Sequence, residues 1–482
     1  MAMPDRELAG AIAATRFGLG ARPGEIGEAT RDPRGWLKAQ VRAEGADLFP
    51  TGGETAARRI ADLREFQQSR QMAKREIAGD PQTAAEARDP VKLAQKMLRQ
   101  DTAGDFLART QLAATTPAGF RERWALFWSN HFTVAANKLQ TATVVGPFET
   151  EAIRPHVFGR FQDLLIAAET HPAMLLYLDQ VQSVGPDSPL AQRAAGIGRR
   201  GVGARLQPVA QRTLGLNENL AREIMELHTV GVRGGYTQAD VTEFARAMTG
   251  LSIGGFRGPE AEIGAPVFRL AAHEPGERSV MGVRYRAGGR EQVGAILTDL
   301  AAKPQTARFV CGKIARHFVA DEPPPALVAR LEKAWMGSGG DLAKVAEALI
   351  AAPEAWNPNP AKFKTPYEFL VSSYRAAAAS PQGIQQVAPI LTALGQKPFA
   401  PGSPKGWPED AGAWAAPDAV VKRMQFAQGF AALFVQGRDP KRLAAEALGA
   451  RLSPATAAAV ARAESRPEGF ALLLMSPEFQ RR

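Results

Sequence analysis

The histidine in the most distinctive chemical setting is His131, near the end of a helix predicted over residues 119–134. Trp124, Phe127 and Trp128 precede it at helical spacing, which places all four side chains on one helix face. An imidazole at the wall of an aromatic pocket can act as a general base, or bind a metal or a haem iron. The same pattern is typical of a core histidine whose ring nitrogens bond to neighbours. The sequence leaves both interpretations open.

A second set of polar side chains lies in the stretch from Leu216 to Ser252. Asn219, Glu223 and Glu226 follow at i, i+4 and i+7 of a predicted helix and form one polar stripe. Two glutamates on one face can bind a divalent cation or act as an acid and base pair. They can equally form ion pairs with nearby arginines, Arg222 and Arg246.

Two further histidines are candidate binding residues. His228 lies on the apolar stripe beside the glutamates, and His273 lies in the turn HEPGERS between two predicted strands, at 268–270 and 280–285. The tip of such a β-hairpin could lean over a helical site. A solvated turn is the alternative interpretation of His273.

Several familiar catalytic motifs are missing from the sequence. It contains no His-Glu-x-x-His zinc helix, no Gly-x-Ser-x-Gly nucleophile elbow and no Walker A loop. The single cysteine, Cys311, excludes a multi-thiolate zinc or iron–sulfur site, and its apolar helical context predicts a buried side chain.

Helix starts are marked by a side-chain acceptor followed by proline, a pair that caps a helix and supplies its first residue. The segments between these pairs are rich in helix-forming residues, so we expect a mainly α protein: a large multi-helix globular fold with one short β-hairpin at about 265–286. The pairs begin at Asp32, Asp89, Thr116, Thr365, Asp439, Ser453 and Ser476.

Two capping boxes are also predicted, Thr237 with Asp240 and Thr365 with Glu368. The aromatic loop at 395–414 is expected to pack across the core. We expect one domain over 1–482, with a subdivision at 1–105 (N-terminal helices), 106–252 (central helical core), 253–290 (hairpin insert) and 291–482 (C-terminal helices).

The chain has 482 residues and a formal charge of +10, but its arginines are interleaved with acids, so we do not expect nucleic-acid binding. The sequence contains no run of about 18 apolar residues, so we expect no membrane span. Charges at Asp5, Arg6 and Glu7 interrupt the region where a secretory signal would be apolar. We therefore expect a cytoplasmic protein, while a periplasmic role through a partner stays open.

Motifs along nearly the whole chain, in the right order, resemble the bacterial family called domain of unknown function 1800. The resemblance implies a mainly helical bacterial protein whose gene often neighbours one for an exported sulfatase-like protein. The motifs include RFGLGARPGE, ERWALFWSNHFTV, HPAMLLYLD, LNENLAREIMELHTVGVRGGYTQADV, HEPGERSVMG, ARFVCGKIARHFVADEPP, KTPYEFL, GQKPF and SPEFQRR.

Two functional hypotheses follow. In the first, the protein is a metal- or haem-dependent enzyme of unknown substrate and cofactor. In the second, it is a non-catalytic accessory or scaffold for the sulfatase-like partner. Convergence of the histidine and the glutamates in one pocket would favour the enzyme. Its catalytic candidates are His131, Glu223 and Glu226, and its binding candidates are Trp128, Asn130, Asn219, His228 and His273.

Overall fold

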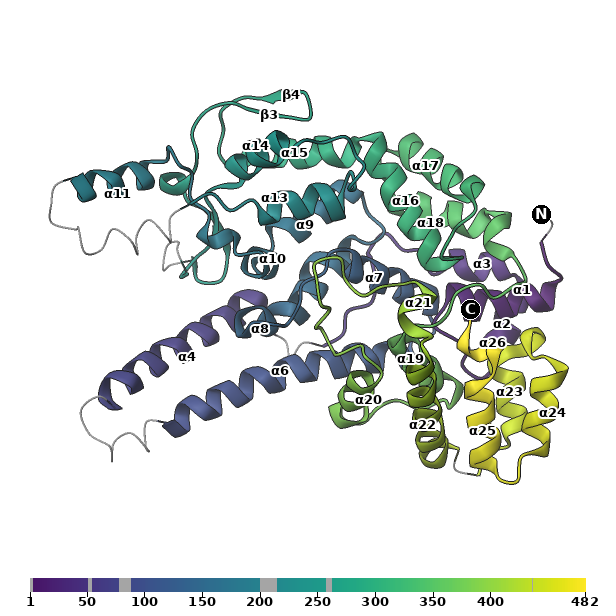
Figure 1. Cartoon of the computed structure of the whole chain (residues 1–482). Coiled ribbons are helices and arrows are strands. Elements are labelled where there is room, and N and C mark those ends of the chain that lie inside the picture. Colours follow the sequence, from purple (N-terminus) through teal and green to yellow (C-terminus); the bar gives the residue numbers. More distant parts are fainter. Residues whose placement is uncertain (1–2, 51–53, 78–87, 200–214, 257–261, 436) are drawn as a thin grey trace.

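The computed structural model of the chain describes residues 3–50, 54–77, 88–199, 215–256, 262–435 and 437–482 (Figure 1). Helices dominate, and the strands named among these residues form two small two-stranded antiparallel sheets. The prediction of a mainly α protein is confirmed. Within the described ranges, no helix is both long and apolar enough to cross a membrane.

The N-terminal third begins with short helices and continues into a long antiparallel pair, α4 and α6, that projects from the body (Figure 1). Leu63, Phe66 and Leu98 form a small apolar cluster between these two long helices. The elements are α1 (Arg6–Ile12), the π-helix η1 (Ala13–Phe17), α2 (Glu25–Arg31), α3 (Pro33–Lys38), α4 (Ala56–Ile77) and α6 (Arg88–Thr115).

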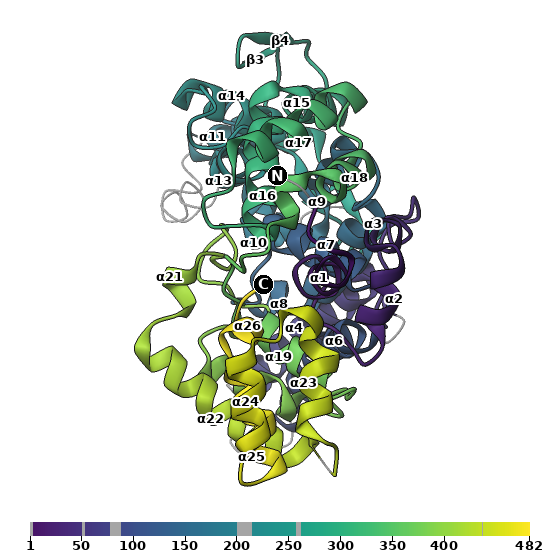
Figure 2. The same cartoon turned by 90° about the vertical axis from the view of Figure 1, so that its right-hand side faces the viewer.

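The middle of the chain surrounds α7, which lies near the centre of the molecule in both views (Figures 1 and 2). Its aromatic side chains are buried, and so is every other residue from Gly119 to Trp128. The elements are α7 (Gly119–His131), α8 (Leu139–Phe148), the π-helix η2 (Glu149–Ile153), η3 (Arg154–His156), α9 (Phe161–Thr170), α10 (Pro172–Tyr177), η4 (Gln180–Gln182), α11 (Pro189–Arg199), α13 (Asn219–Glu223), the π-helix η5 (Ile224–His228) and α14 (Gln238–Met248).

A short β-hairpin is present, but the predicted pairing of 268–270 with 280–285 is wrong. Strand β1 (Leu251–Ile253) pairs with β2 (Pro266–Phe268), and β3 (Arg278–Val280) pairs with β4 (Val283–Tyr285). The turn between β3 and β4 is Met281-Gly282, and both residues have positive φ, 47° and 79°. A two-residue turn of this hand matches the twist of a hairpin, so β3 pairs locally and not across HEPGERS.

The C-terminal part closes the molecule. Its elements are η7 (Leu270–Ala272), α15 (Arg290–Ala302), α16 (Pro304–Phe318), α17 (Pro325–Ser338), α18 (Leu342–Ala351), η8 (Pro353–Trp356), α19 (Pro366–Ala376), η9 (Ile384–Gln386), α20 (Ala388–Ala393), α21 (Ala411–Trp414), α22 (Pro417–Phe434), α23 (Pro440–Leu448), η10 (Gly449–Arg451), α24 (Pro454–Arg462), α25 (Arg466–Met475) and α26 (Pro477–Gln480).

One hydrophobic core runs from Ala9 to Phe479 and joins residues from both ends of the chain. Helix α1 contacts η10 and α2 contacts α23, so the N-terminal helices lie against the C-terminal ones (Figure 2). The subdivision of the chain expected from its sequence stays a prediction.

Most of the predicted helix starts are confirmed. Asp32, Thr365, Asp439, Ser453 and Ser476 each cap a helix with proline in its first turn. The pair Asp89-Pro90 lies within α6, whose first described residue is Arg88. One start is shifted, because α7 begins at Gly119. The Thr116 hydroxyl instead accepts a hydrogen bond from the Ala118 amide at 3.1 Å, which closes a turn ahead of α7.

Candidate functional site

A cavity of about 110 Å³ lies between α6, α7, α8, the start of α19 and the loop over residues 394–410. This is several times the space that one water molecule needs. Its walls are mainly apolar and include Phe106, Leu126, Val145, Phe148 and Phe399. A cavity with apolar walls and a few polar groups is typical of small-molecule sites.

The loop over 394–410 is fastened to α7 by one side chain, Asn130. Its Nδ2 donates to the Trp407 carbonyl at 3.0 Å, and its Oδ1 accepts from the Trp407 amide at 2.8 Å. Gly406 has a φ of 79°, and a Cβ there would lie 2.5 Å from the Asn130 carbonyl oxygen. Glycine is therefore required at the closest approach. Phe399 of this aromatic loop is part of the hydrophobic core and Trp414 beyond it is buried, whereas Trp407 is half-buried.

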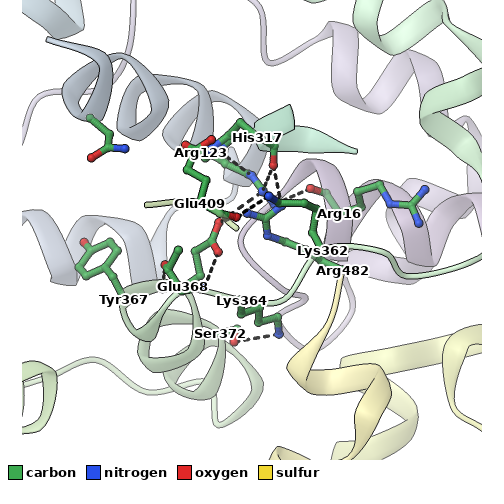
Figure 3. A network of polar contacts seen from close by, with 12 residues as sticks. Arg16, Arg123, His317, Lys362, Lys364, Tyr367, Glu368, Ser372, Glu409 and Arg482 are labelled. Carbon is green, nitrogen blue, oxygen red and sulfur yellow. Dashed lines mark hydrogen bonds and ion pairs between the residues drawn. The ribbon is translucent and has the colours of Figure 1, made fainter. Parts of the chain in front are cut away.

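One wall of the cavity carries a histidine and a glutamate in direct contact (Figure 3). His317 Nδ1 lies 2.6 Å from Glu409 Oε1, while Arg123 Nε donates to His317 Nε2 at 3.2 Å. Because arginine can only donate, Nε2 must accept and Nδ1 carries the proton that is donated to Glu409. Burial lowers the pKa of His317. Burial alone would raise the pKa of Glu409, but His317 and Lys362 outweigh it, so this carboxyl is ionised at neutral pH.

Behind this pair lies a buried network of charged side chains (Figure 3). Glu368 Oε1 accepts from Arg482 at 2.6 Å and lies 3.3 Å from Arg123 Nη2. Arg123 and Arg482 both donate to the His317 carbonyl, at 3.1 and 2.7 Å. Burial opposes ionisation of Glu368, yet the two arginines hold its pKa well below the usual value. Three residues therefore hold His317 in place: Arg123 and Glu409 contact its ring, and Arg123 and Arg482 donate to its carbonyl.

His131 is buried at the interface of α7 and α16, and it does not line the cavity. Its Nε2 lies 3.1 Å from the His228 carbonyl oxygen, and its Nδ1 lies 2.9 Å from Lys313 Nζ. The carbonyl can only accept, so Nε2 carries the proton and Nδ1 accepts from the lysine. Burial and the charge of Lys313 hold the pKa of His131 well below its usual value. Both ring nitrogens are therefore in use, and neighbouring Trp128 is also fully buried.

His228 meets a glutamate that the sequence did not indicate. Its Nδ1 lies 2.7 Å from Glu169 Oε1, and both side chains are almost completely buried. His228 ends the π-helix η5, and widened turns of this kind are frequent at functional sites. The other two π-helices of the described chain also carry polar residues of the interior, Arg16 and Glu149.

The predicted polar stripe of α13 and η5 faces outward. Asn219 is exposed, and Glu223 and Glu226 are half-buried. Tyr236 Oη lies 3.5 Å from Glu226, at the limit of a hydrogen bond. Burial and the neighbouring Glu226 raise the pKa of Glu223. Among the described residues, no hydrogen bond or ion pair joins either glutamate to His131.

His273 is buried, so the alternative of a solvated turn is wrong. Its ring nitrogens lie 2.9 Å from the carbonyl oxygens of Thr249 and Gly288. The adjacent Glu274 accepts from the Asp187 amide at 2.8 Å. These contacts hold the connection between β2 and β3 against α14 and the start of α15, and His273 does not line the cavity.

Of the eight candidate residues, Asn130 lines the cavity and the other seven do not. Four of these are buried elsewhere, namely Trp128, His131, His228 and His273. Asn219 is exposed, and Glu223 and Glu226 are half-buried. Within the described residues, no group of three or more His, Cys, Asp or Glu side chains is arranged to hold a metal ion.

The sequence reasoning missed Arg109, Arg123, His317, Glu368 and Glu409. The sequence indicated only a capping-box role for Glu368. The capping box is present, but Glu368 also binds the two arginines. For His317 and Glu368 the available signal was a titratable side chain within an apolar helix pattern, because such a side chain is buried only when it has polar partners.

The family comparison covers almost the whole chain. The family model described as "Protein of unknown function (DUF1800)" matches residues 12–481. No match was found among curated proteins or among solved structures. The chain belongs to the DUF1800 family.

Proposed function

We propose that this protein binds a small molecule in the cavity beneath the loop over 394–410 and that Glu409 acts on it as a general base. One observation carries the proposal: Glu409 lines the cavity with only Oε1 bound to His317. No described residue hydrogen-bonds to Oε2. An ionised carboxylate oxygen at a mainly apolar wall can accept a proton from a bound molecule or from water.

The neighbours of Glu409 suit this role. His317 orients the carboxylate, and Arg123 keeps the ring in the tautomer that donates to it. Preorganised groups of this kind lower the cost of reaching a reactive geometry. His317 is a positioning residue in this proposal, since its second nitrogen is occupied by Arg123.

The metal- or haem-dependent enzyme expected from the sequence stays a prediction, with His131, Glu223 and Glu226 as its candidates. A metal or haem iron bound by His131 would have to displace Lys313 or the His228 carbonyl from the ring. Elemental analysis and an absorption spectrum of the purified protein test it. A colourless protein that takes up no ion on titration would contradict it.

The accessory role with a sulfatase-like partner also stays a prediction. Its test is co-purification of the two proteins, and a strictly solitary monomer would count against it.

A fragment screen by ligand-observed NMR on the full chain tests the proposed site. Val134 and Val145 line the cavity, so Val134→Phe and Val145→Phe should each fill it and abolish binding of the fragments that occupy it. Thermal unfolding identifies any variant that has lost its fold. If both blocking variants remain folded and bind the same fragments as the wild type, the cavity is not the site.

Glu409→Gln separates binding from chemistry. The neutral amide keeps the shape of the side chain, so fragments should still bind. Conversion of any fragment that the wild type transforms should slow by about 10²–10⁴-fold, the range for loss of a general base. The rates are followed by NMR over time. Unchanged turnover in Glu409→Gln would remove this residue from the mechanism.

A further inference from the structure

Arg109 lies on α6 and lines the cavity, surrounded by three aromatic rings. Its guanidinium carbon is 5.5, 5.0 and 5.4 Å from the ring centres of Phe106, Tyr367 and Phe399. The side chain is 13% exposed. Such a cage holds a planar guanidinium in place through cation–π contacts while leaving its edges available.

The guanidinium forms one ion pair with the protein among the described residues. Its Nε lies 3.1 Å from Glu149 Oε2, without the geometry of a hydrogen bond. The other oxygen of Glu149 is occupied by Arg154, whose Nε and Nη2 donate to it at 3.0 and 2.8 Å. Arg154 also binds both oxygens of Glu122, so its charge is fully paired. The two oxygens of Glu149 therefore contact different arginines, Oε1 contacting Arg154 and Oε2 contacting Arg109.

The two terminal nitrogens of Arg109 differ from those of the other deeply placed arginines. Arg16 donates to three carbonyls, and Arg375 binds Glu25 and two carbonyls through its terminal nitrogens. No described residue accepts a hydrogen bond from Nη1 or Nη2 of Arg109. A guanidinium with two unused donors beside a cavity is suited to a ligand that supplies two acceptors.

We infer that the molecule bound in the cavity is a small carboxylate whose two oxygens accept from Nη1 and Nη2 of Arg109. The planar fork of arginine matches a carboxylate in a bidentate pair. The cations Lys397 and Arg123 also line the cavity, where they balance the carboxylates of Glu149, Glu368 and Glu409. Apolar walls such as Val145, Phe148 and Leu391 suit a short aromatic or branched aliphatic body. This inference rests on the proposed function, since it names the class of molecule that occupies the same cavity.

Matched carboxylates and amides test the inference. The full-length wild type is titrated calorimetrically with benzoate, benzamide, isovalerate and isovaleramide, which differ within each pair only in charge and donor pattern. The acids should bind about tenfold or more tightly than the amides, because hydrogen bonds to charged groups exceed neutral ones. Arg109→Gln should remove this preference and leave amide binding nearly unchanged. Arg99→Gln, an exposed arginine on the same helix, is the control and should behave like the wild type.

The outcomes separate the inference from the proposed function. Equal binding of acids and amides, or an acid preference that survives in folded Arg109→Gln, overturns the carboxylate assignment while leaving a small-molecule site. Binding that Val134→Phe and Val145→Phe do not affect overturns the cavity itself. Arg109→Lys, which keeps the charge without the fork, should retain part of the acid preference. Amide binding that persists in Arg109→Gln shows that this variant is folded.

Discussion

At the scale of single residues, some buried charged side chains have partners other than a single opposite charge. Lys313 is an example, since its amine meets the neutral ring of His131 at 2.9 Å. Burial lowers the pKa of Lys313 from 10.5 to about 8, although the charge of Glu409 opposes the shift. The folded protein therefore holds this proton less tightly than the unfolded chain does.

The pKa of Lys313 predicts a specific dependence of stability on pH. Between about pH 8 and 10.5 the unfolded chain binds more protons at this lysine than the folded protein, so its contribution to stability rises with pH in that window. Lys313→Met should lack this gain. Chemical unfolding at pH 7.5, 9 and 10.5 measures it, with exposed Lys333→Met as the control. Parallel pH profiles for wild type and Lys313→Met would contradict the assignment.

How much the sequence revealed also differs from residue to residue. Helical spacing predicted that His131 shares a face with Trp124 and Trp128, which the ring contacts of Trp128 with both residues confirm. It could not predict that Lys313 and His228 would meet this ring, because those contacts span 182 and 97 residues. Likewise, the partner of His317 lies 92 residues away, in a loop. Local patterns report which face is buried, but not what it is buried against.

At the scale of elements, the loop over 394–410 forms one side of the proposed site and depends on Asn130. Asn130→Ala removes both hydrogen bonds to Trp407 and leaves its backbone groups with water or without a partner. The free energy of unfolding should fall by about 1–3 kcal/mol.

Limited proteolysis should cut Asn130→Ala faster within 394–410, and benzoate should bind more weakly. Thr298→Ala is the control, because Thr298 does not line the cavity and its hydroxyl donates within its own helix, to the Gly294 carbonyl. If the loop of Asn130→Ala resists proteolysis as well as the wild type does, other contacts hold it in place.

Helix boundaries were predictable because capping is local chemistry. The box of Thr237 and Asp240 is present, as is that of Thr365 and Glu368. Strand pairing was not, because a turn of two residues at Met281 and Gly282 competes with the longer HEPGERS segment. The strands on either side of the two-residue turn, β3 and β4, pair with each other.

At the scale of the whole molecule, long-range side-chain contacts join segments that are distant in sequence. Arg375 links α19 to Glu25 and to the carbonyls of Ala113 and Thr116. Glu368 links the start of α19 to Arg123 of α7 and to Arg482. The last helices are thereby tied to the same core as the first.

Glu368→Gln tests this integration. It would leave two buried guanidiniums without their carboxylate, which should lower the free energy of unfolding by about 3–5 kcal/mol at pH 7. Because the pKa of Glu368 is depressed in the folded protein, its contribution is present above the ordinary value of 4.5 and is lost as pH falls below it. The difference between wild type and Glu368→Gln should therefore shrink in acid.

Urea unfolding at pH 7 and pH 4 measures this difference, with exposed Glu28→Gln as the control. A Glu368→Gln protein as stable as the wild type at pH 7 would show that the network does not tie the chain ends to the core.

The most direct measurement is a crystal structure of the full chain grown with benzoate. We predict one benzoate beneath the loop over 394–410, with its carboxylate on Nη1 and Nη2 of Arg109 and its ring against the apolar wall that includes Phe148. Glu409 Oε2 should face the bound molecule. A cavity filled by collapsed side chains, with benzoate bound only at the surface, would contradict a carboxylate site at Arg109.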